Sequence, residues 1–434
     1  MASRTPDWSE LASENERFLT DGGASGERLV PASLWQASAE HIASTAHAAV
    51  APAPAPVSAT RPRRRARWRI RTAQGAAVGA AAVAVTTAAL AVTTTASASP
   101  AVPPLAWHFA KQVHQGDNGE FTAIAAVGTN GGWAFSGDGA VAPTAFRRSG
   151  ATWTPAPFPG HSDERVVTAQ ATSAANVWAF TTNGTRSRAL RWNGTSWSVA
   201  GSFSREIAGA VVISRTDVWV FGDQFQPGGV LGTWHFNGRA WIHVPGEGSL
   251  NGGSALSAAS IWAFGGTHVA HWNGRAWSAT SVASLLPARD KSGLNDPAVM
   301  AIYAQSATSV WAVGNGNRED EGGPLVVLHF NGQAWSQVAE SQAFGGFDAF
   351  GQVAPDGRDG LWIPVPGSEG GPSHLVHYSG GHLTAAVLPA AAARITVQSV
   401  AWIPGTFQAL AGGLTHAPDN FGAGDVAVVL QFER

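Results

Sequence analysis

The sequence predicts an all-β fold, a seven-bladed β-propeller spanning residues 105–434. The first observation is a short apolar run built around a tryptophan, which recurs at intervals of 40 to 51 residues, the period of propeller blades. The second is a turn with Asn-Gly or Ser-Gly between two apolar stretches, which follows most of these runs. The seven tryptophans are Trp133, Trp178, Trp219, Trp262, Trp311, Trp362 and Trp402.

Each repeat predicts four short strands, A to D. Strand A is small and neutral, as in TAIAAV; strand B carries the VWAVG phrase, strand C the LVVLHF phrase and strand D the AWSQV phrase. Asn-Gly between two apolar runs indicates a tight hairpin of C and D, because both turn residues must tolerate positive φ. Strands B and C are apolar on both faces, as expected for a sheet packed between two neighbouring sheets. Seven such sheets therefore stack around an axis.

The seventh repeat has no strand D after its strand C, the closing phrase VVLQFER. The segment LAWHFAKQV, Leu105 to Val113, has the aromatic spacing of a strand D and precedes the first strand A. We expect it to complete the C-terminal blade, so that chain from both ends closes the ring.

Four further segments precede the propeller. Residues 1–60 are rich in Ala, Ser and Pro and predict a disordered cytoplasmic tail, with a partner-binding segment as the alternative. Residues 61–71 contain seven arginines, a basic juxtamembrane segment, and residues 72–98 are uncharged and predict a transmembrane signal anchor. Residues 99–104 form a linker. The arginines place the N-terminus in the cytoplasm and the propeller outside a single-pass cell-membrane protein. Cleavage after Ala98 is the alternative, because residues 96–98 have a small-x-small pattern.

Composition excludes several kinds of chemistry. The chain has no cysteine, so disulfides, thiolate metal sites and cysteine nucleophiles are absent. A net charge of −2 gives no reason to expect nucleic acid as a partner. Abundant Arg and Ala with little Lys suggest a bacterial source. We expect no cofactor, and a monomeric propeller.

The repeat, a VWAV strand followed by a WNGxxW hairpin, resembles the tectonin-type propeller repeat and, more distantly, kelch-type and galactose-oxidase-like propellers. The likeness covers residues 105–434. Most blades lack the Gly-Gly pair of kelch repeats, no WD dipeptide closes strand C, and the Asp-box of sialidase-type propellers is absent. The resemblance implies recognition of carbohydrate or cell-surface material rather than catalysis.

Two recurring residue types are expected to be structural. The B-strand tryptophans recur once per blade at one register, which is typical of core residues packed between blades. Histidines at one position of strand C recur around the ring and therefore cannot meet at one metal ion. They are His235, His271, His329 and His377, with Arg147, Arg191 and Gln431 as equivalents.

The B–C and D–A connections share one face of the ring and hold the insertions, residues 222–229, 284–296, 314–323 and 416–425. Insertions gathered on one face mark the binding face of such scaffolds. The starts of the A strands border the channel mouth on this face. The charged residues there are Glu120, Arg165 and Glu206, each thirteen residues before a B-strand tryptophan, and Asp296, Asp348 and Arg394 at nearby positions. We predict that these six residues bind a polar ligand, with no metal ion.

The sequence therefore predicts a non-enzymatic, membrane-anchored recognition module that binds a carbohydrate, cell-wall or protein ligand through this face. One alternative is an envelope glycoside hydrolase or lyase that uses Glu120, Glu206 and Asp348. Another is a transmembrane signalling protein that reports to a partner on residues 1–60.

Overall fold

The computed structural model describes most of the predicted propeller. The described residues are 104–114, 119–137, 141–222, 232–245, 248–288, 297–316, 323–346, 352–365, 373–389, 394–416 and 425–434. The predicted tail, basic segment and anchor, with the linker up to residue 103, lie outside them. Within the described ranges no helix is long and apolar enough to cross a membrane.

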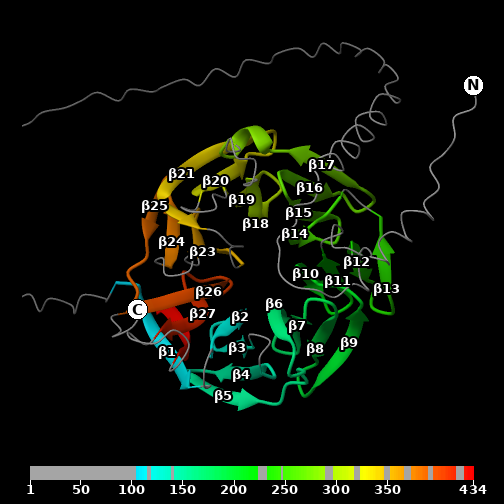
Figure 1. Cartoon of the computed structure of the whole chain (residues 1–434), viewed down its shortest axis with the longest axis vertical. Coiled ribbons are helices and arrows are strands. Elements are labelled where there is room, and N and C mark those ends of the chain that lie inside the picture. The colour runs from blue at the N-terminus through cyan, green and yellow to red at the C-terminus, as the bar shows by residue number, and fades with distance from the viewer. Residues whose placement is uncertain are drawn as a thin grey trace, which may run out of the picture. The chain divides into compact units, whose positions relative to one another are not determined.

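Seven four-stranded antiparallel sheets surround a central axis, as predicted (Figure 1). Strand A of each sheet lies nearest the axis and strand D lies on the rim. Blades 1 to 3 are β2 (Phe121–Val127), β3 (Gly131–Ser136), β4 (Thr144–Ser149) and β5 (Thr152–Ala156); β6 (Arg165–Ser173), β7 (Asn176–Thr182), β8 (Ser187–Trp192) and β9 (Trp197–Phe203); and β10 (Gly209–Ser214), β11 (Asp217–Phe221), β12 (Thr233–Phe236) and β13 (Trp241–Val244).

Blades 4 to 6 repeat the same order. They are β14 (Gly252–Ser257), β15 (Ser260–Gly265), β16 (His268–Trp272) and β17 (Trp277–Ser281); β18 (Ala298–Ser306), β19 (Ser309–Asn315), β20 (Gly323–Phe330) and β21 (Trp335–Gly346); and β22 (Ala354–Pro355), β23 (Leu361–Val365), β24 (His374–Ser379) and β25 (His382–Ala385). A short 3-10 helix, η1 (Ala283–Leu285), follows blade 4.

The seventh blade is closed by the N-terminal strand, which confirms the predicted closure. It consists of β26 (Arg394–Trp402), β27 (Ala409–His416), β28 (Val426–Glu433) and β1 (Ala106–His114), in the spatial order β26-β27-β28-β1. Strand β1 pairs antiparallel with β28, with Ala106 opposite Glu433 and Trp107 opposite Phe432. Strand β1 thus takes the place of strand D.

We name the two ends of the ring by their connections. In an antiparallel blade the A–B and C–D turns lie at one end, which we call the hairpin face. The B–C and D–A connections lie at the other end, which we call the loop face. Several C–D turns have one geometry: in the turn after β12, Asn237 Oδ1 accepts from the amides of Arg239 and Ala240 at 3.0 Å, and Gly238 has φ +89°.

Aromatic residues pass from blade to blade through the core. Trp133 of β3 contacts Trp192 and Trp197 of the next blade at ring-centroid distances of 5.0 and 5.1 Å. Between blades 6 and 7, Trp107 of β1 packs edge-on against Trp362 of β23, with the ring centroids 5.2 Å apart. Six of the seven tryptophans of the repeat are at most 8% exposed, which confirms their predicted place in the core: Trp133, Trp178, Trp219, Trp262, Trp311 and Trp362.

The assignment of Trp402 to strand B is wrong. Trp402 is the last residue of β26, the A strand, and its Nε1 donates to the carbonyl of Thr406 in the A–B turn at 2.8 Å. The core position belongs to Leu410 of β27, which lies opposite Gln431 and is fully buried. A tryptophan is unnecessary there because Leu410 packs against Phe146 and Trp153 of blade 1.

The strand C histidines are structural, as predicted, and each stacks on a B-strand tryptophan. His271 lies 4.4 Å from Trp262 between ring centroids, and its Nε2 lies 3.1 Å from Ser260 Oγ. The other three pairs are His235 on Trp219, His329 on Trp311 and His377 on Trp362, at 4.1 to 4.4 Å. Among the residues that the structure describes, no group of three His, Asp or Glu residues is placed to hold a metal ion.

Candidate ligand-binding cavity

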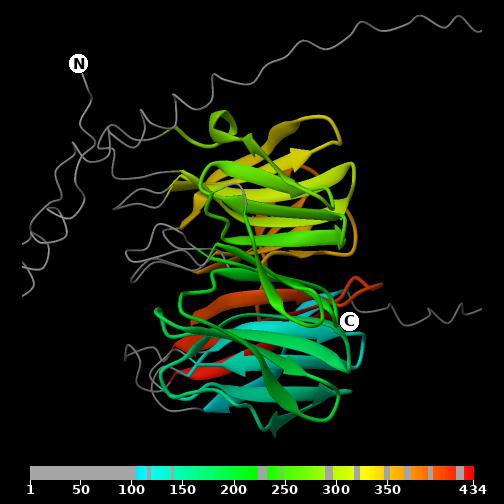
Figure 2. The same ribbon diagram turned by 90° about the vertical axis from the view of Figure 1, so that its right-hand side faces the viewer.

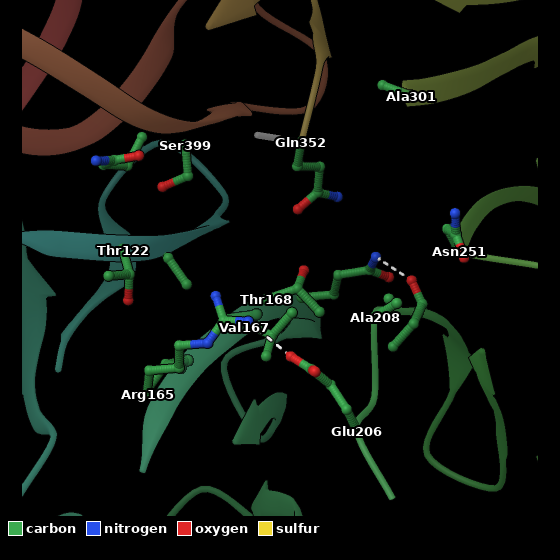
Figure 3. Close-up of a pocket in the computed structure, with 18 of the residues that line it drawn as sticks. Thr122, Arg165, Val167, Thr168, Glu206, Ala208, Asn251, Ala301, Gln352 and Ser399 are labelled. Carbon is green, nitrogen blue, oxygen red and sulfur yellow. Dashed lines mark hydrogen bonds and ion pairs between the residues drawn. The ribbon is translucent and has the colours of Figure 1, made fainter. Parts of the chain in front are cut away.

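A cavity of about 900 Å³ lies at the centre of the ring, where the starts of the A strands come together (Figure 3). All seven blades contribute to its wall. In blade order, contributions come from Glu120 and Thr122, Arg165 to Gln170, Arg205 and Glu206, Asn251 to Gly253, Val299 to Ile302, Gln352 and Val353, and Gln398 and Ser399. The cavity therefore occupies the predicted channel mouth on the loop face.

The structure places three of the six predicted site residues in this wall. Glu120 lies one residue before β2, Arg165 is the first residue of β6, and Glu206 lies three residues before β10. Arg394 is the exposed first residue of β26 and is not part of the wall. Asp296 and Asp348 lie outside the described residues.

Arg165 and Glu206 join blades 2 and 3 across the mouth. Arg165 Nη2 lies 2.6 Å from Glu206 Oε1 (Figure 3), and the two side chains are 53% and 32% exposed. An ion pair this exposed contributes at most about 1 kcal/mol to stability. Either side chain can therefore leave the ion pair and bind a ligand at little energetic cost.

Glu120 joins blades 1 and 7 through a residue that sequence reasoning missed. Gln398 Nε2 donates to Glu120 Oε2 at 2.9 Å. Gln398 lies where the pairing of β26 with β27 shifts register, between Val397 and Ser399. Its only sequence signal is the single carboxamide in the A-strand segment RITVQSVAW.

A second glutamine holds the inner edges of blades 2 and 3 together. Gln170 Nε2 donates to the Ala210 carbonyl at 2.7 Å, and the Val212 amide donates to Gln170 Oε1 at 2.8 Å. Strand A lies at the edge of its sheet, so the backbone N–H and C=O groups on its free side have no neighbouring strand and need other hydrogen-bond partners. The Gln170 carboxamide provides them, which fixes the spacing of the cavity wall at this seam.

The loop that precedes Arg165 is held by two further ion pairs. Glu164 and Arg188 form a bidentate pair whose side chains are 7% and 13% exposed, and Asp163 lies 3.6 Å from Arg186 on the surface. Burial alone would raise the pKa of Glu164, but the hydrogen bonds from Arg188 and the His161 amide outweigh it and lower the pKa. The buried Glu164–Arg188 pair anchors the base of Arg165, whereas the exposed Asp163–Arg186 pair contributes little.

The charged side chains of the described cavity wall lie on one side of the ring. Blades 1 to 3 supply the charged groups, whereas blades 4 to 6 supply Val299, Met300 and Val353 together with the uncharged amides of Asn251 and Gln352. The described wall contains no Trp or Tyr, and its one aromatic ring, Phe264, is 8% exposed. It thus lacks the exposed ring on which a sugar would stack.

No protein-family model matches the chain, and no curated protein matches it. Solved structures do. A structure of U3-55K matches with 12% identity, 75% of this chain, 98% of that chain and a TM-score of 0.50. The WD40 repeats of RRP9 match with 13% identity, 76% and 98% coverage and a TM-score of 0.50. A chain of the Mitotic Checkpoint Complex matches with 11% identity, 81% and 99% coverage and a TM-score of 0.50. At these identities the likeness identifies the fold, a seven-bladed propeller with WD40-repeat propellers among its structural neighbours.

Proposed function

We propose that the propeller is a non-enzymatic recognition module that binds a segment of a protein partner in the loop-face cavity. The observation that carries this proposal is the composition of the wall, with opposite charges on blades 1 to 3 and the apolar side chains of Val299, Met300 and Val353 on blades 5 and 6. A peptide offers a backbone, charged groups and apolar side chains together, and so matches both sides. One structural neighbour is a chain of the Mitotic Checkpoint Complex, a protein assembly, which agrees with this choice.

A protein ligand fits the cavity better than a carbohydrate. Sugar recognition relies on exposed aromatic faces, and the described wall offers only the buried ring of Phe264. The tectonin-type resemblance of the repeats, which favours carbohydrate or cell-surface material, rests on the strand B and C phrases, and these build the blade core rather than the cavity.

The proposal includes the membrane anchor. Seven arginines in residues 61–71 precede the uncharged residues 72–98, and this order supports a single span with the propeller outside the cytoplasm. If the mass of the mature protein matched a chain that begins at Ser99, the segment would instead be a cleaved signal.

Binding is tested with the full-length chain in lipid nanodiscs, screened against a peptide library and a glycan array with a hydrolysis readout. We expect retention of peptides and a loss of at least about tenfold in affinity for Glu120→Ala/Arg165→Ala/Glu206→Ala. The matched control is Asp163→Ala/Arg186→Ala, which removes a more exposed ion pair of the same face outside the cavity wall and keeps parental affinity.

Three results would contradict the proposal. Glycan binding without peptide binding would assign the module to carbohydrate, and turnover would support the envelope hydrolase. Unchanged peptide affinity in the triple variant, with an unchanged melting temperature, would move the site away from the cavity.

A further inference from the structure

The opposite end of the ring, the hairpin face, carries arginines without acidic partners. Four of them lie on neighbouring blades: Arg191 at the end of β8, Arg215 in the A–B turn of blade 3, and Arg239 and Arg275 in the C–D turns of blades 3 and 4. The last three are exposed, and Arg191 is half-buried. Within the described residues no carboxylate lies within ion-pair distance of these four guanidinium groups.

Arg215 and Arg239 lie on contacting turns of blade 3, and Arg191 and Arg275 lie at the same end of the two neighbouring blades. The pKa of Arg191 is lowered first by burial and second by the charge of Arg215, and the Arg191 guanidinium carbon lies 5.7 Å from the ring centroid of Trp178. The turn of Arg239 packs on that of Arg215, since a Cβ on Gly238 would lie 2.7 Å from Thr216 Cβ. The acid on this part of the face is Asp217, which is already engaged by Trp219 Nε1 at 3.0 Å and His235 Nε2 at 2.9 Å.

The loop face of the same blades is different, because its charges are compensated. Arg165, Arg186 and Arg188 each have a carboxylate partner there, at Glu206, Asp163 and Glu164. Among the described residues, the same stretch of chain thus pairs these arginines with carboxylates on the loop face and leaves those of the hairpin face without carboxylate partners. An uncompensated basic surface of this kind attracts an anionic partner.

Two further features of the hairpin face indicate which anionic partner binds there. Leu256 at the end of β14 is 37% exposed, and Phe407 in the A–B turn of blade 7 is 46% exposed, with the Arg358 guanidinium 4.7 Å from its ring centroid. Leu256 adds an exposed apolar side chain to blade 4, and Arg358 with Phe407 places an arginine on an exposed aromatic ring at the turns of blades 6 and 7; both arrangements suit the headgroup region of a bilayer. Leu256 and Phe407 are spread around the rim of the channel rather than gathered in one pocket.

The point of attachment is the second feature. Strand β1 begins at Ala106, opposite Glu433, so the preceding chain joins the propeller at the hairpin face. The C-terminus lies at this same end of the blades, at the right of Figure 2. Six residues, 99–104, separate the proposed anchor from Leu105, and six residues reach about 20 Å at most. A bilayer surface would therefore be held close to this face.

We propose that the hairpin face of blades 2 to 4 docks on the anionic lipid headgroups of the membrane, which turns the loop-face cavity away from the bilayer. This proposal rests on the anchor of the proposed function. Each arginine near an anionic surface raises the binding constant for that surface by about fivefold at low salt. Physiological salt reduces the effect, because the Debye length is then about 8 Å.

The test uses the full-length chain reconstituted in phosphatidylcholine vesicles with or without about one-third phosphatidylglycerol. Because the chain has no cysteine, single substitutions give unambiguous fluorescent labels. Thr195→Cys labels the C–D turn of blade 2 on the hairpin face, and Thr185→Cys labels its B–C turn on the loop face. The sites are matched: both residues are exposed, and each amide donates to the side chain of an asparagine two residues earlier.

Quenching by a headgroup-labelled lipid then reports which face lies near the bilayer. We expect at least twofold stronger quenching at position 195 than at position 185 in anionic vesicles. Arg215→Glu/Arg239→Glu/Arg275→Glu should abolish the difference, and the corresponding triple substitution to lysine should retain it. Equal quenching of the two labels, or stronger quenching at position 185, would overturn the docking and favour an acidic protein as the partner of this face.

Alkaline extraction of the same vesicles separates failure of the anchor from failure of the docking face. A chain that is released from the vesicles by alkali has no membrane-spanning anchor. In that case the arginine surface is judged by low-salt binding to anionic against neutral vesicles: a preference lost in the glutamate variant keeps the docking face, and equal binding removes it.

Discussion

The histidine of each Trp–His stack replaces water on a tryptophan face that would otherwise be exposed at the rim of the core. In blades 4 and 5 the histidine has only a serine hydroxyl as its polar partner, at 3.1 Å. Burial lowers the pKa of His271 and His329, because a partly buried imidazolium loses hydration. These two residues make the stability of the ring sensitive to mild acid.

The free energy of unfolding should fall as the pH drops from 7 to 5. The folded pKa of His271 and His329 lies below the unfolded value of about 6.5, so the unfolded chain binds more protons in this range. Their contribution is complete above that value and is lost as the pH falls toward the folded pKa. Urea titrations of His271→Gln/His329→Gln should show a shallower pH dependence than the parent chain. An unchanged slope would contradict the assignment.

Asp356 adds to the acid sensitivity at lower pH. Burial would raise its pKa, but hydrogen bonds from His377 and from the amides of Arg358 and Gly360 outweigh burial and lower the pKa. A carboxyl group with a lowered folded pKa stabilises the fold above its unfolded pKa of about 3.9 and loses this effect as the pH falls further.

Arg188→Ala should destabilise the propeller by about 3 kcal/mol, because it leaves the Glu164 carboxylate buried without its partner. The neighbouring substitution Arg186→Ala is the control, since that pair is exposed and should cost less than about 1 kcal/mol. Urea denaturation of both variants measures the difference. Equal costs would mean that the Glu164–Arg188 pair is solvated.

Single residues show where sequence reasoning stops. The tryptophan period places six core residues correctly, but Trp402 satisfies the same pattern from the A strand, and only strand pairing identifies Leu410 as the core residue. Position relative to strand B also predicts Glu120, Arg165 and Glu206 in the cavity wall. Gln170 and Gln398 are not predicted, because the hydrogen-bond partners of an uncharged carboxamide depend on positions that only the folded structure shows.

At the scale of the element, β1 is the least replaceable strand. It supplies the D-strand tryptophan of blade 7, since Trp107 is 3% exposed and contacts both Trp362 and Phe432. The sequence predicts this strand well, because its aromatic spacing is that of the other D strands and the seventh repeat lacks one.

Deletion of residues 101–113 should abolish cooperative unfolding. The deletion exposes the edge of β28 and removes Trp107 from the space between blades 6 and 7, so the ring loses its closing contact. Calorimetry should show a broad transition, or several transitions, in place of one. The milder variant Trp107→Ala should keep one transition with a stability lower by about 3 to 5 kcal/mol. A parental melting curve for the deletion would contradict the closure.

At the scale of the whole molecule, the ring is circular in space although the chain is linear. Ala106 and Glu433 face each other across the β1–β28 pair, at the position where other blades have a two- to four-residue C–D turn. Joining Arg434 to Leu105 through an Asn-Gly turn and opening the chain between β1 and β2 should therefore preserve the fold. We expect the permuted propeller to melt within a few degrees of the parent. Failure to fold, with a wild-type-order chain as control, would show that the N-terminal position of β1 is needed for assembly.

The fold is more predictable than the ligand for a physical reason. The blades repeat the same buried apolar pattern seven times. A wrong strand assignment in one blade, such as that of Trp402, therefore does not change the predicted fold. The cavity wall is assembled from one short segment of each blade, and no pattern in the chain relates the charge of Arg165 to that of Glu206 or the carboxamide of Gln398 to Glu120.

The pairing of β1 with β28 also has a consequence for folding kinetics. During synthesis β1 is the first strand of the propeller to emerge, and its partner is the last. Closing a loop of more than 300 residues, rather than the roughly ten of a hairpin, costs about 3 kcal/mol more in chain entropy. Blades 1 to 6 form from local hairpins, whereas the seventh waits for the complete chain. Until then β1 and the incomplete ring present exposed edges, so this seam is the step at which aggregation competes with folding.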